Sequence, residues 1–364
     1  MNKAHVNNRE RFLKTMHFEE VDHPPFFMDD PWYDTWERWY LEGYPKGTSL
    51  ADYFKVEPLK IENVGIDTFL IPPFTPTVIE EDDEIVISTD CYGAKLRTFK
   101  KQTAMPEWLE YAVQTENDLL ALIDRLETQM DRRVPTDWEE RRLKLKENKD
   151  APVCACGGSY YGILRNLMGV ETVSMMLYDS PDTIRSWLEA YHRLIMQILE
   201  KVFAETRVDY LWFGEDFAYR NSSLISPSMY RELIQPKHKM VTDFARARGV
   251  DIFFFDSDGN LNEILPDLLA GGINLLYPIE CAADMDTVAL RRKYGRRIRM
   301  IGGIDKREIA KGKEAIKREL YTKVPPLIKE GGFIPRIDHS VSSDISLENF
   351  TYYFELLKEI YGVK

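Results

Sequence analysis

Residues 250–260 read VDIFFFDSDGN, the pattern of a buried β-strand that runs directly into two acids and a glycine. Carboxylates are costly to bury without compensation, so Asp256 and Asp258 at a strand end indicate either a functional site or a helix cap. Their spacing of two places both side chains on one face if the strand persists. Gly259 then permits a turn into a helix that we expect to start near Asn260.

Four further apolar runs in the second half of the chain also end in polar residues. They are LWFGED (211–216), LLYPIE (275–280), MIGGID (300–305) and FIPRIDH (333–339). Strand-like runs start near 151, 208, 250, 273, 298 and 332, and helical patterns cover 181–206, 227–248, 260–270, 286–294, 305–330 and 346–361. This alternation predicts a parallel sheet with helical crossovers. Polar groups at the carboxyl ends of such strands are typical of a (β/α)₈ barrel with its chemistry on one rim.

The first 150 residues are less regular. We expect a helix over 5–20 and a first barrel strand at 26–28, and runs at 77–88 and 94–101 resemble an antiparallel hairpin. Two charged helical segments follow, at about 116–130 and 136–148. The sequence therefore predicts one α/β domain over residues 1–364, a (β/α)₈ TIM barrel with extra N-terminal helices and a β-hairpin insertion at about 77–101.

The composition excludes several classes of protein. Hydrophobic residues make up 44% of the chain, enough for a large core, and no apolar run approaches the ~20 residues of a membrane span. The formal net charge of −12 argues against nucleic acid and against an anionic membrane surface, because both require clustered Lys and Arg. The N-terminus lacks the apolar segment of a secretory signal, and four cysteines do not suggest a disulfide framework. We therefore expect a cytoplasmic protein.

Several candidate site residues also have a structural interpretation. Asp258 and Asp305 could each cap a following helix. Glu215 and Asp216 are adjacent, so on an extended strand they face opposite ways and at most one enters the site. We favour Glu215, and Glu280 has a similar claim because it also follows a strand.

Three other features leave similar alternatives. His339 follows the last strand directly, where a histidine is either structural or functional. Cys154 and Cys156 face one side of a strand, but no second Cys pair completes a zinc set, so we interpret them as small core residues. The segment GGSYY at 157–161 opens a helix. Either the free amides of that helix hold an anion, or the two glycines serve close packing.

The chain resembles the uroporphyrinogen decarboxylase superfamily, which includes cobalamin-dependent methyltransferases. The resemblance runs over nearly the whole chain and implies the (β/α)₈ barrel. It rests on RFL (11–13) with VDHPP (21–25), GGS (157–159) with Gly169, ISP (225–227), the turn 256–259, and GGF (331–333) with Asp338, His339, Asp344, Ile345, Glu348 and Asn349.

Departures from the family pattern separate its branches. True decarboxylases of uroporphyrinogen carry an arginine-bearing segment after the first strand, where residues 28–32 read MDDPW, and their catalytic aspartate has no clear match in IPPF (71–74). The methyltransferase branch has a zinc-binding His-x-Cys-Gly at the turn where this chain has Asp256-x-Asp258-Gly259, and a later Cys near the position of His339. Carboxylate and imidazole ligands make a harder site than thiolates and suit oxygen.

The resemblance therefore implies a corrinoid-dependent methyltransferase that takes a methyl group from a small methoxy compound, for example an aryl methyl ether. The alternative is a decarboxylase of the uroporphyrinogen decarboxylase type, acting on a small or tetrapyrrole carboxylate. The expected partners are the small-molecule methyl donor and a corrinoid (cobalamin) protein that accepts the methyl group. Aromatic residues from Trp32 to Tyr40 would pack against an aryl substrate, a loop or a second subunit, so a homodimer is compatible with the sequence.

The expected site residues fall into three groups. Zn²⁺ or another divalent metal would bind Asp256, Asp258 and His339 and polarise the leaving oxygen. The same three residues would be catalytic, with Glu280 or Glu215 as a further ligand or proton donor. The expected substrate-binding residues are Arg165, Tyr160, Trp32, Arg336 and Asn260.

Overall fold

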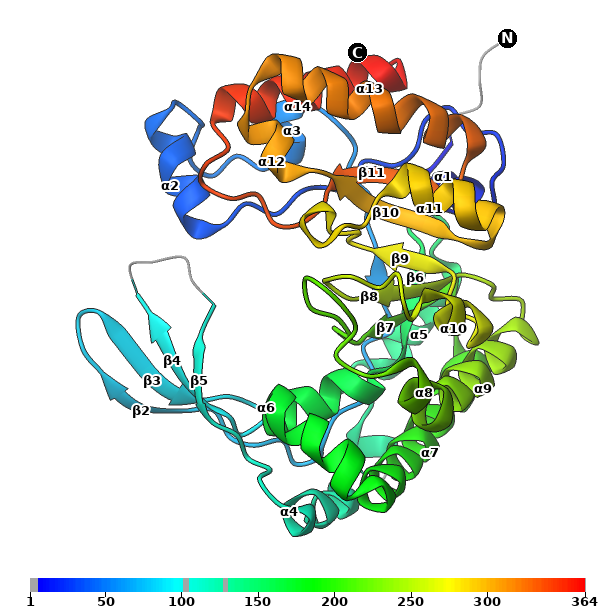
Figure 1. Ribbon diagram of the computed structural model, residues 1–364. Coiled ribbons are helices and arrows are strands. Elements are labelled where there is room, and N and C mark those ends of the chain that lie inside the picture. The colour runs from blue at the N-terminus through cyan, green and yellow to red at the C-terminus, as the bar shows by residue number, and fades with distance from the viewer. Residues whose placement is uncertain (1–5, 101–104, 127–129, 364) are drawn as a thin grey trace.

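Seven parallel strands form one sheet in the computed structural model, which describes residues 6–100, 105–126 and 130–363 (Figure 1). Their order in the sheet is β1 (Glu62–Asn63), β6 (Val153–Gly158), β7 (Tyr210–Gly214), β8 (Phe253–Asp256), β9 (Leu275–Tyr277), β10 (Arg299–Ile304) and β11 (Phe333–Ile337). The six strands predicted from residue 151 onward are confirmed, each beginning within a few residues of the expected place.

An extended segment at 26–31 occupies the eighth position. The amide of Leu59, just before β1, donates to the carbonyl of Phe26 over 2.7 Å. On the other side the amide of Val341, which follows β11, donates to the carbonyl of Asp30 over 3.0 Å. These bonds join the two edges of the sheet, and the fold is the predicted TIM-barrel-like α/β fold.

Helix α1 (Asn8–Met16) covers the amino-terminal end of the barrel. Its Phe12 and Met16 pack with interior side chains such as Tyr210 and Phe254. The amide of Gly332 at the start of β11 donates to the carbonyl of Thr15, which fixes the helix at this end. The functional site is therefore expected at the opposite rim, where the strands end.

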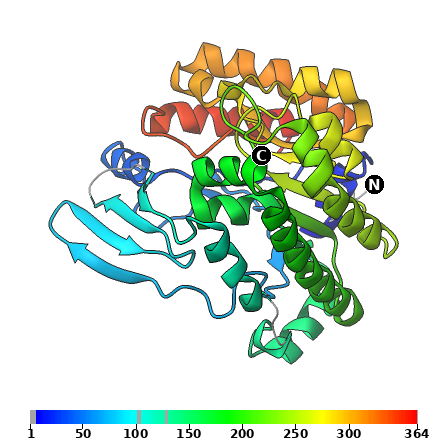
Figure 2. The same cartoon turned by 60° about the horizontal axis from the view of Figure 1, so that its bottom comes forward.

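The helices that follow the strands form the outer layer (Figure 2). They are α6 (Tyr160–Asp179), α7 (Pro181–Glu205), α8 (Pro227–Met229), the π-helical η3 (Tyr230–Ile234), α9 (Gln235–Arg246), α10 (Leu265–Ala270), α11 (Thr287–Tyr294), α12 (Lys306–Ala310), α13 (Lys313–Glu330) and α14 (Leu347–Tyr361). The side chains of Ser226 and Ser346 accept amide protons at the starts of α8 and α14 and cap both helices. None of the described helices is both long and apolar enough to cross a membrane.

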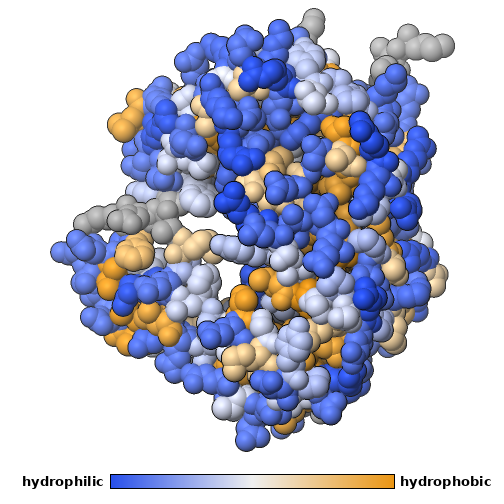
Figure 3. Space-filling model, in the orientation of Figure 1, coloured by the Kyte–Doolittle hydropathy of each residue, from blue (hydrophilic) through white to orange (hydrophobic). Residues whose placement is uncertain are grey.

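The predicted hairpin is one part of a four-stranded antiparallel sheet. The strands are β2 (Thr77–Glu81), β3 (Ile85–Thr89), β4 (Lys95–Phe99) and β5 (Glu107–Glu110). The run at 77–88 is not a single strand, because the side chain of Asp82 accepts the amides of Glu84 and Ile85 and closes a turn. The predicted hairpin's end at 101 lies outside the described residues. The sheet stands beside the barrel, and Figure 3 shows apolar side chains on its surface. Val78 and Ile79 of β2 are exposed.

Two predicted helical segments are shorter than expected. The segment at 116–130 contains α4 (Glu116–Ala121) and η1 (Ile123–Arg125), while 127–129 lie outside the described residues and Met130 begins η2 (Met130–Arg132). The second segment is α5 (Trp138–Glu147). Two short helices, α2 (Tyr33–Leu41) and α3 (Leu50–Phe54), follow the first barrel segment and pack near α14.

Candidate active site

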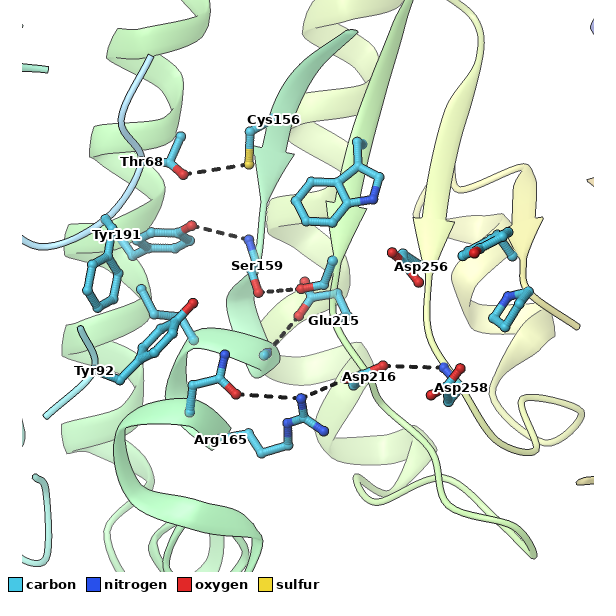
Figure 4. Close-up of a pocket in the computed structure, with 18 of the residues that line it drawn as sticks. Thr68, Tyr92, Cys156, Ser159, Arg165, Tyr191, Glu215, Asp216, Asp256 and Asp258 are labelled. Atoms are coloured by element: carbon cyan, nitrogen blue, oxygen red, sulfur yellow. Dashed lines mark hydrogen bonds and ion pairs between the residues drawn. The ribbon is translucent and has the colours of Figure 1, made fainter. Parts of the chain in front are cut away.

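A cavity of about 480 Å³ lies at the carboxyl ends of the strands (Figure 4). Its polar walls come from the ends of β7, β8 and β11, from the start of α6, and from the loop after β1. The side chains that define it include Thr68, Tyr92, Arg165, Asn166, Asp216, Asp256, Asp258, Tyr277 and His339. Five of the residues expected in the site line this one cavity, namely Arg165, Glu215, Asp256, Asp258 and His339.

Asp256 is the last residue of β8 and lies in the cavity wall. Burial raises its pKa to about 7, and the nearby charges of Asp216 and Asp258 raise it in the same direction. A hydrogen bond with Trp212 opposes this shift. Near neutral pH this carboxyl can therefore exist in either protonation state, as a general acid requires.

Asp258 and His339 form a pair at the mouth of the cavity. The Nε2 atom of His339 lies 3.4 Å from a carboxylate oxygen of Asp258. The amide of Ser340 donates to Nδ1 over 2.8 Å, so in the neutral ring the proton lies on Nε2 and faces the carboxylate. Asp258 raises the pKa of His339. Helix α10 begins only at Leu265, so Asp258 is not its cap.

Arg165 and Asp216 form a second charged pair. A guanidinium nitrogen of Arg165, on α6, lies 2.7 Å from an oxygen of Asp216 (Figure 4). The other oxygen of Asp216 accepts the amide of Asp258 over 3.3 Å. Asp216 has a φ of 47°, so the chain after β7 leaves the extended conformation there and turns this side chain into the cavity.

Glu215 is buried behind this layer and holds the start of α6. Its carboxylate accepts the amides of Tyr160, Tyr161 and Gly162 over 2.8, 2.7 and 3.0 Å. A ring nitrogen of His238 lies 3.0 Å away. The anion that the GGSYY segment was expected to hold is thus a side chain of the protein itself.

The remaining expected site residues lie in different surroundings. Tyr160 is buried, and its hydroxyl bonds the Nδ1 atom of His192 over 2.9 Å. Arg336 is also buried, bonds the hydroxyl of Tyr277 and lies 3.4 Å from Asp29. Neither residue reaches the cavity directly, although Tyr277 lines it.

Three further expected residues are not among those that line the cavity. Trp32 lies edge-on to His339, with ring centroids 6.4 Å apart. Glu280 accepts the amide of Gly259 over 3.1 Å and lines a neighbouring groove with Arg307. The side chain of Asn260 accepts a nearby backbone amide in its own loop.

The aromatic residues of α2 pack away from the cavity. Trp39 is buried, and its indole donates to the carbonyl of Ile345 over 2.9 Å. Trp36 stacks on Tyr40 and lies edge-on to Trp39. These residues belong to a hydrophobic cluster with α14, so the expected aryl wall is a structural contact between elements.

The cysteines are all free, as expected for a chain without a disulfide framework. Cys154 is buried, and Cys156 lines the cavity. Asp305 caps α12 by accepting the amide of Arg307, so the structural interpretation of this residue holds.

The three expected metal ligands are not grouped as a metal centre. Among residues 6–100, 105–126 and 130–363, no three His, Cys, Asp or Glu side chains are placed to hold one ion. Asp258 and His339 face each other directly, whereas Asp256 lies deeper, at the end of β8. As arranged, the donor set does not fit a metal ion.

Sequence reasoning missed Asp216, Tyr92, Asn166 and Tyr277 as cavity residues. For Asp216 the sequence predicted that at most one acid of the Glu215–Asp216 pair enters the site, whereas both line the cavity. Tyr277 could have been predicted from the sequence, since it is two residues from Leu275 on the same face of β9. Tyr92 and Asn166 are brought in by the antiparallel sheet and by α6, for which the sequence held no comparable signal.

Comparisons with known proteins agree with this architecture. The family model for uroporphyrinogen decarboxylase (URO-D) matches residues 84–360. A solved structure described as a methyltransferase from Methanosarcina mazei has a TM-score of 0.59 and 15% sequence identity, covering 98% of this chain and 100% of that chain. At this identity the likeness concerns the fold, and a search of curated proteins finds no significant match. Because the family model matches most of its length, the chain belongs to the uroporphyrinogen decarboxylase (URO-D) family.

Proposed function

We propose that this protein is a methyltransferase that moves a methyl group from a small methoxy compound to the cobalt of a corrinoid protein. The observation that carries the proposal is Asp256, a carboxyl with a pKa of about 7 in the wall of the rim cavity. An alkoxide or phenoxide is a poor leaving group unless it receives a proton, and a carboxyl with this pKa can donate one at neutral pH. The fold shared with a methyltransferase supports the same class of reaction.

In the proposed reaction the bond between the methyl carbon and the ether oxygen breaks. The reduced corrinoid supplies the electron pair that takes the methyl group, and Asp256 gives its proton to the oxygen, so an alcohol or phenol leaves. Trp212 orients the carboxyl through its hydrogen bond. The Asp258–His339 and Arg165–Asp216 pairs keep the mouth polar and limit the negative charge around Asp256.

Decarboxylation is the second candidate, because it is the reaction after which the family model is named. Arg165 would bind the substrate carboxylate, and Asp256 would protonate the carbanion left after loss of carbon dioxide. Against this candidate, Arg165 already pairs with Asp216, and two further aspartates face the cavity. A substrate with many carboxylates would be repelled by this surface.

One assay separates the two candidates. The protein is incubated with a reduced corrinoid protein and a panel of methoxy compounds, and the absorption spectrum of methylcobalamin is followed. Release of carbon dioxide from porphyrinogen and small carboxylate substrates is measured in parallel. We expect methylcobalamin with at least one donor. Carbon dioxide release without any methylcobalamin would replace the proposal with the second candidate.

The pH dependence provides a test of the role of Asp256. We expect kcat/KM for methyl transfer to fall as the pH rises through about 7, because the raised pKa means that the carboxyl loses its proton there. Initial rates with one donor between about pH 5.5 and pH 9 measure this, with a separate check that the corrinoid stays reduced. A rate that is independent of pH over this interval would contradict the assignment.

The metal hypothesis from the sequence remains a separate prediction. It would require the Asp258–His339 pair to open and Asp256 to turn toward the same ion, so no step above depends on a metal. If the hypothesis is right, wild type reloaded with zinc retains about one equivalent and an Asp256→Ala/His339→Ala variant does not. Equal, negligible zinc in both, measured by plasma mass spectrometry, would reject it.

A further inference from the structure

A second cavity, of about 350 Å³, lies inside the barrel between Asp256 and helix α1. Its walls are mainly apolar and aromatic. Residues from α1, from the first barrel segment and from the interior faces of β7 to β10 contribute, including Phe12, Phe27, Tyr210, Phe254, Tyr277 and Ile301. We propose that this cavity is the binding site for the ring of a neutral, monocyclic aryl methyl ether. The proposal rests on the proposed function and names its substrate class.

The two cavities meet at three residues. Trp212, Asp256 and Tyr277 line both the polar rim cavity and the apolar interior cavity. The ionisable carboxyl of Asp256 is therefore at the boundary between them. A ligand with its ring in the apolar interior cavity places its oxygen at this carboxyl and its methyl group toward the mouth of the rim cavity. That orientation exposes the methyl carbon to an acceptor and gives the leaving oxygen its proton donor.

The size of the apolar interior cavity fits one aromatic ring. An apolar cavity of ~150 Å³ is enough to hold benzene in a protein core, so about 350 Å³ admits a ring with small substituents. Tyr277 stacks on Phe254 with centroids 5.4 Å apart and lies 5.9 Å from Phe27. Such rings offer the offset and edge contacts that aromatic ligands prefer.

The lining of the apolar interior cavity favours a neutral ligand. Apart from Asp256, its polar lining includes Asn63 and Cys154. Burial raises the pKa of the Cys154 thiol to about 11, and the amide of Asn63 donates to its sulfur over 3.3 Å. The thiol is therefore uncharged near neutral pH, and a charged ring substituent would lack a counter-ion there. Arg336 does not supply one, because it is buried against Asp29 and Tyr277.

Binding of anisole (methoxybenzene), measured by calorimetry without any corrinoid, tests the inference. We expect saturable binding to the wild type and at least a tenfold weaker affinity for Ile301→Phe, whose larger side chain fills the cavity. Ile79→Phe, the same substitution at a 54% exposed position on the antiparallel sheet, is the control and should bind like the wild type. Thermal unfolding followed by circular dichroism establishes that each variant folds. If Ile301→Phe does not fold, Cys154→Leu is the second filling variant, with a weaker affinity also expected.

The possible outcomes distinguish this inference from the proposed function. No saturable binding of anisole to the wild type, or equal affinity in folded Ile301→Phe, overturns the aryl site. If aliphatic methoxy donors support methyl transfer and Ile301→Phe does not slow it, the aryl site is also overturned, while the proposed function stands. Anisole binding that Ile301→Phe weakens, in a protein that methylates no corrinoid, supports the aryl site and rejects the proposed function.

Discussion

Replacing Asp256 with Asn is expected to lower kcat/KM for methyl transfer by about 10²- to 10⁴-fold, the usual contribution of a general acid. The amide keeps the size of the side chain and can still bond Trp212, but it cannot deliver a proton to the leaving oxygen. The residual rate should lose its dependence on pH near 7, because the group with the raised pKa is gone. Methylcobalamin formation under saturating corrinoid measures both effects.

The same substitution should not weaken the fold. Burial places the pKa of Asp256 in the folded protein above its unfolded value of 3.8, so the folded state binds this proton more tightly and loses stability as the pH rises from about 4 to about 7. The amide of the Asp256→Asn variant would not titrate, and its melting temperature at pH 8 should equal or exceed that of the wild type. Asp243→Asn, at an exposed position on α9, is the control for both measurements. Activity within twofold of wild type would remove Asp256 from the mechanism.

The sequence predicted the elements whose pattern is local. Each strand from β6 to β11 is a short apolar run bounded by polar residues or glycine, and burial in a parallel sheet requires such runs. Asp256, Asp258 and His339 could be found for the same reason, since each lies at the end of a strand or within two residues of it. A first barrel strand was also predicted at 26–28, within the segment that closes the barrel, although only single bridges join that segment to its neighbours.

The missed features depend on backbone conformation and on long-range contacts. Asp216 has a left-handed φ, and Glu215 is held by three amides at the start of α6, so the role of each acid depends on contacts that β7 alone does not reveal, although both line the cavity. The aromatic residues of α2 could be placed only by knowing that α14, more than three hundred residues later, packs on Trp39. Neither effect leaves a periodic trace in the sequence.

Glu215 illustrates how a residue expected in catalysis can have a larger structural role. Its carboxylate satisfies three amides at the start of α6, which have no carbonyl partner within the helix, and it also contacts His238. The same helix carries Arg165 to the cavity. The stability of the barrel rim and the geometry of the site are therefore coupled through one buried side chain.

Replacing Glu215 with Ala is expected to lower the free energy of unfolding by about 3–5 kcal/mol, as for the loss of one partner from a buried charged network. Three amides and the ring of His238 would remain buried without an acceptor. Glu215→Gln keeps one acceptor oxygen and should lose less. Urea unfolding followed by circular dichroism at neutral pH measures the free energy of unfolding of the wild type, Glu215→Ala and Glu215→Gln.

The matched control is Glu232→Ala, which removes an exposed ion pair with Arg185 on the outer surface. Exposed pairs contribute about 0–1 kcal/mol, so this variant should stay close to wild type. The ordering of the three losses, with Glu215→Ala largest, Glu215→Gln intermediate and Glu232→Ala smallest, follows from burial and from the number of amides that lose their acceptor. If Glu215→Ala is no less stable than Glu232→Ala, the carboxylate does not anchor α6, and the start of that helix is held by other contacts.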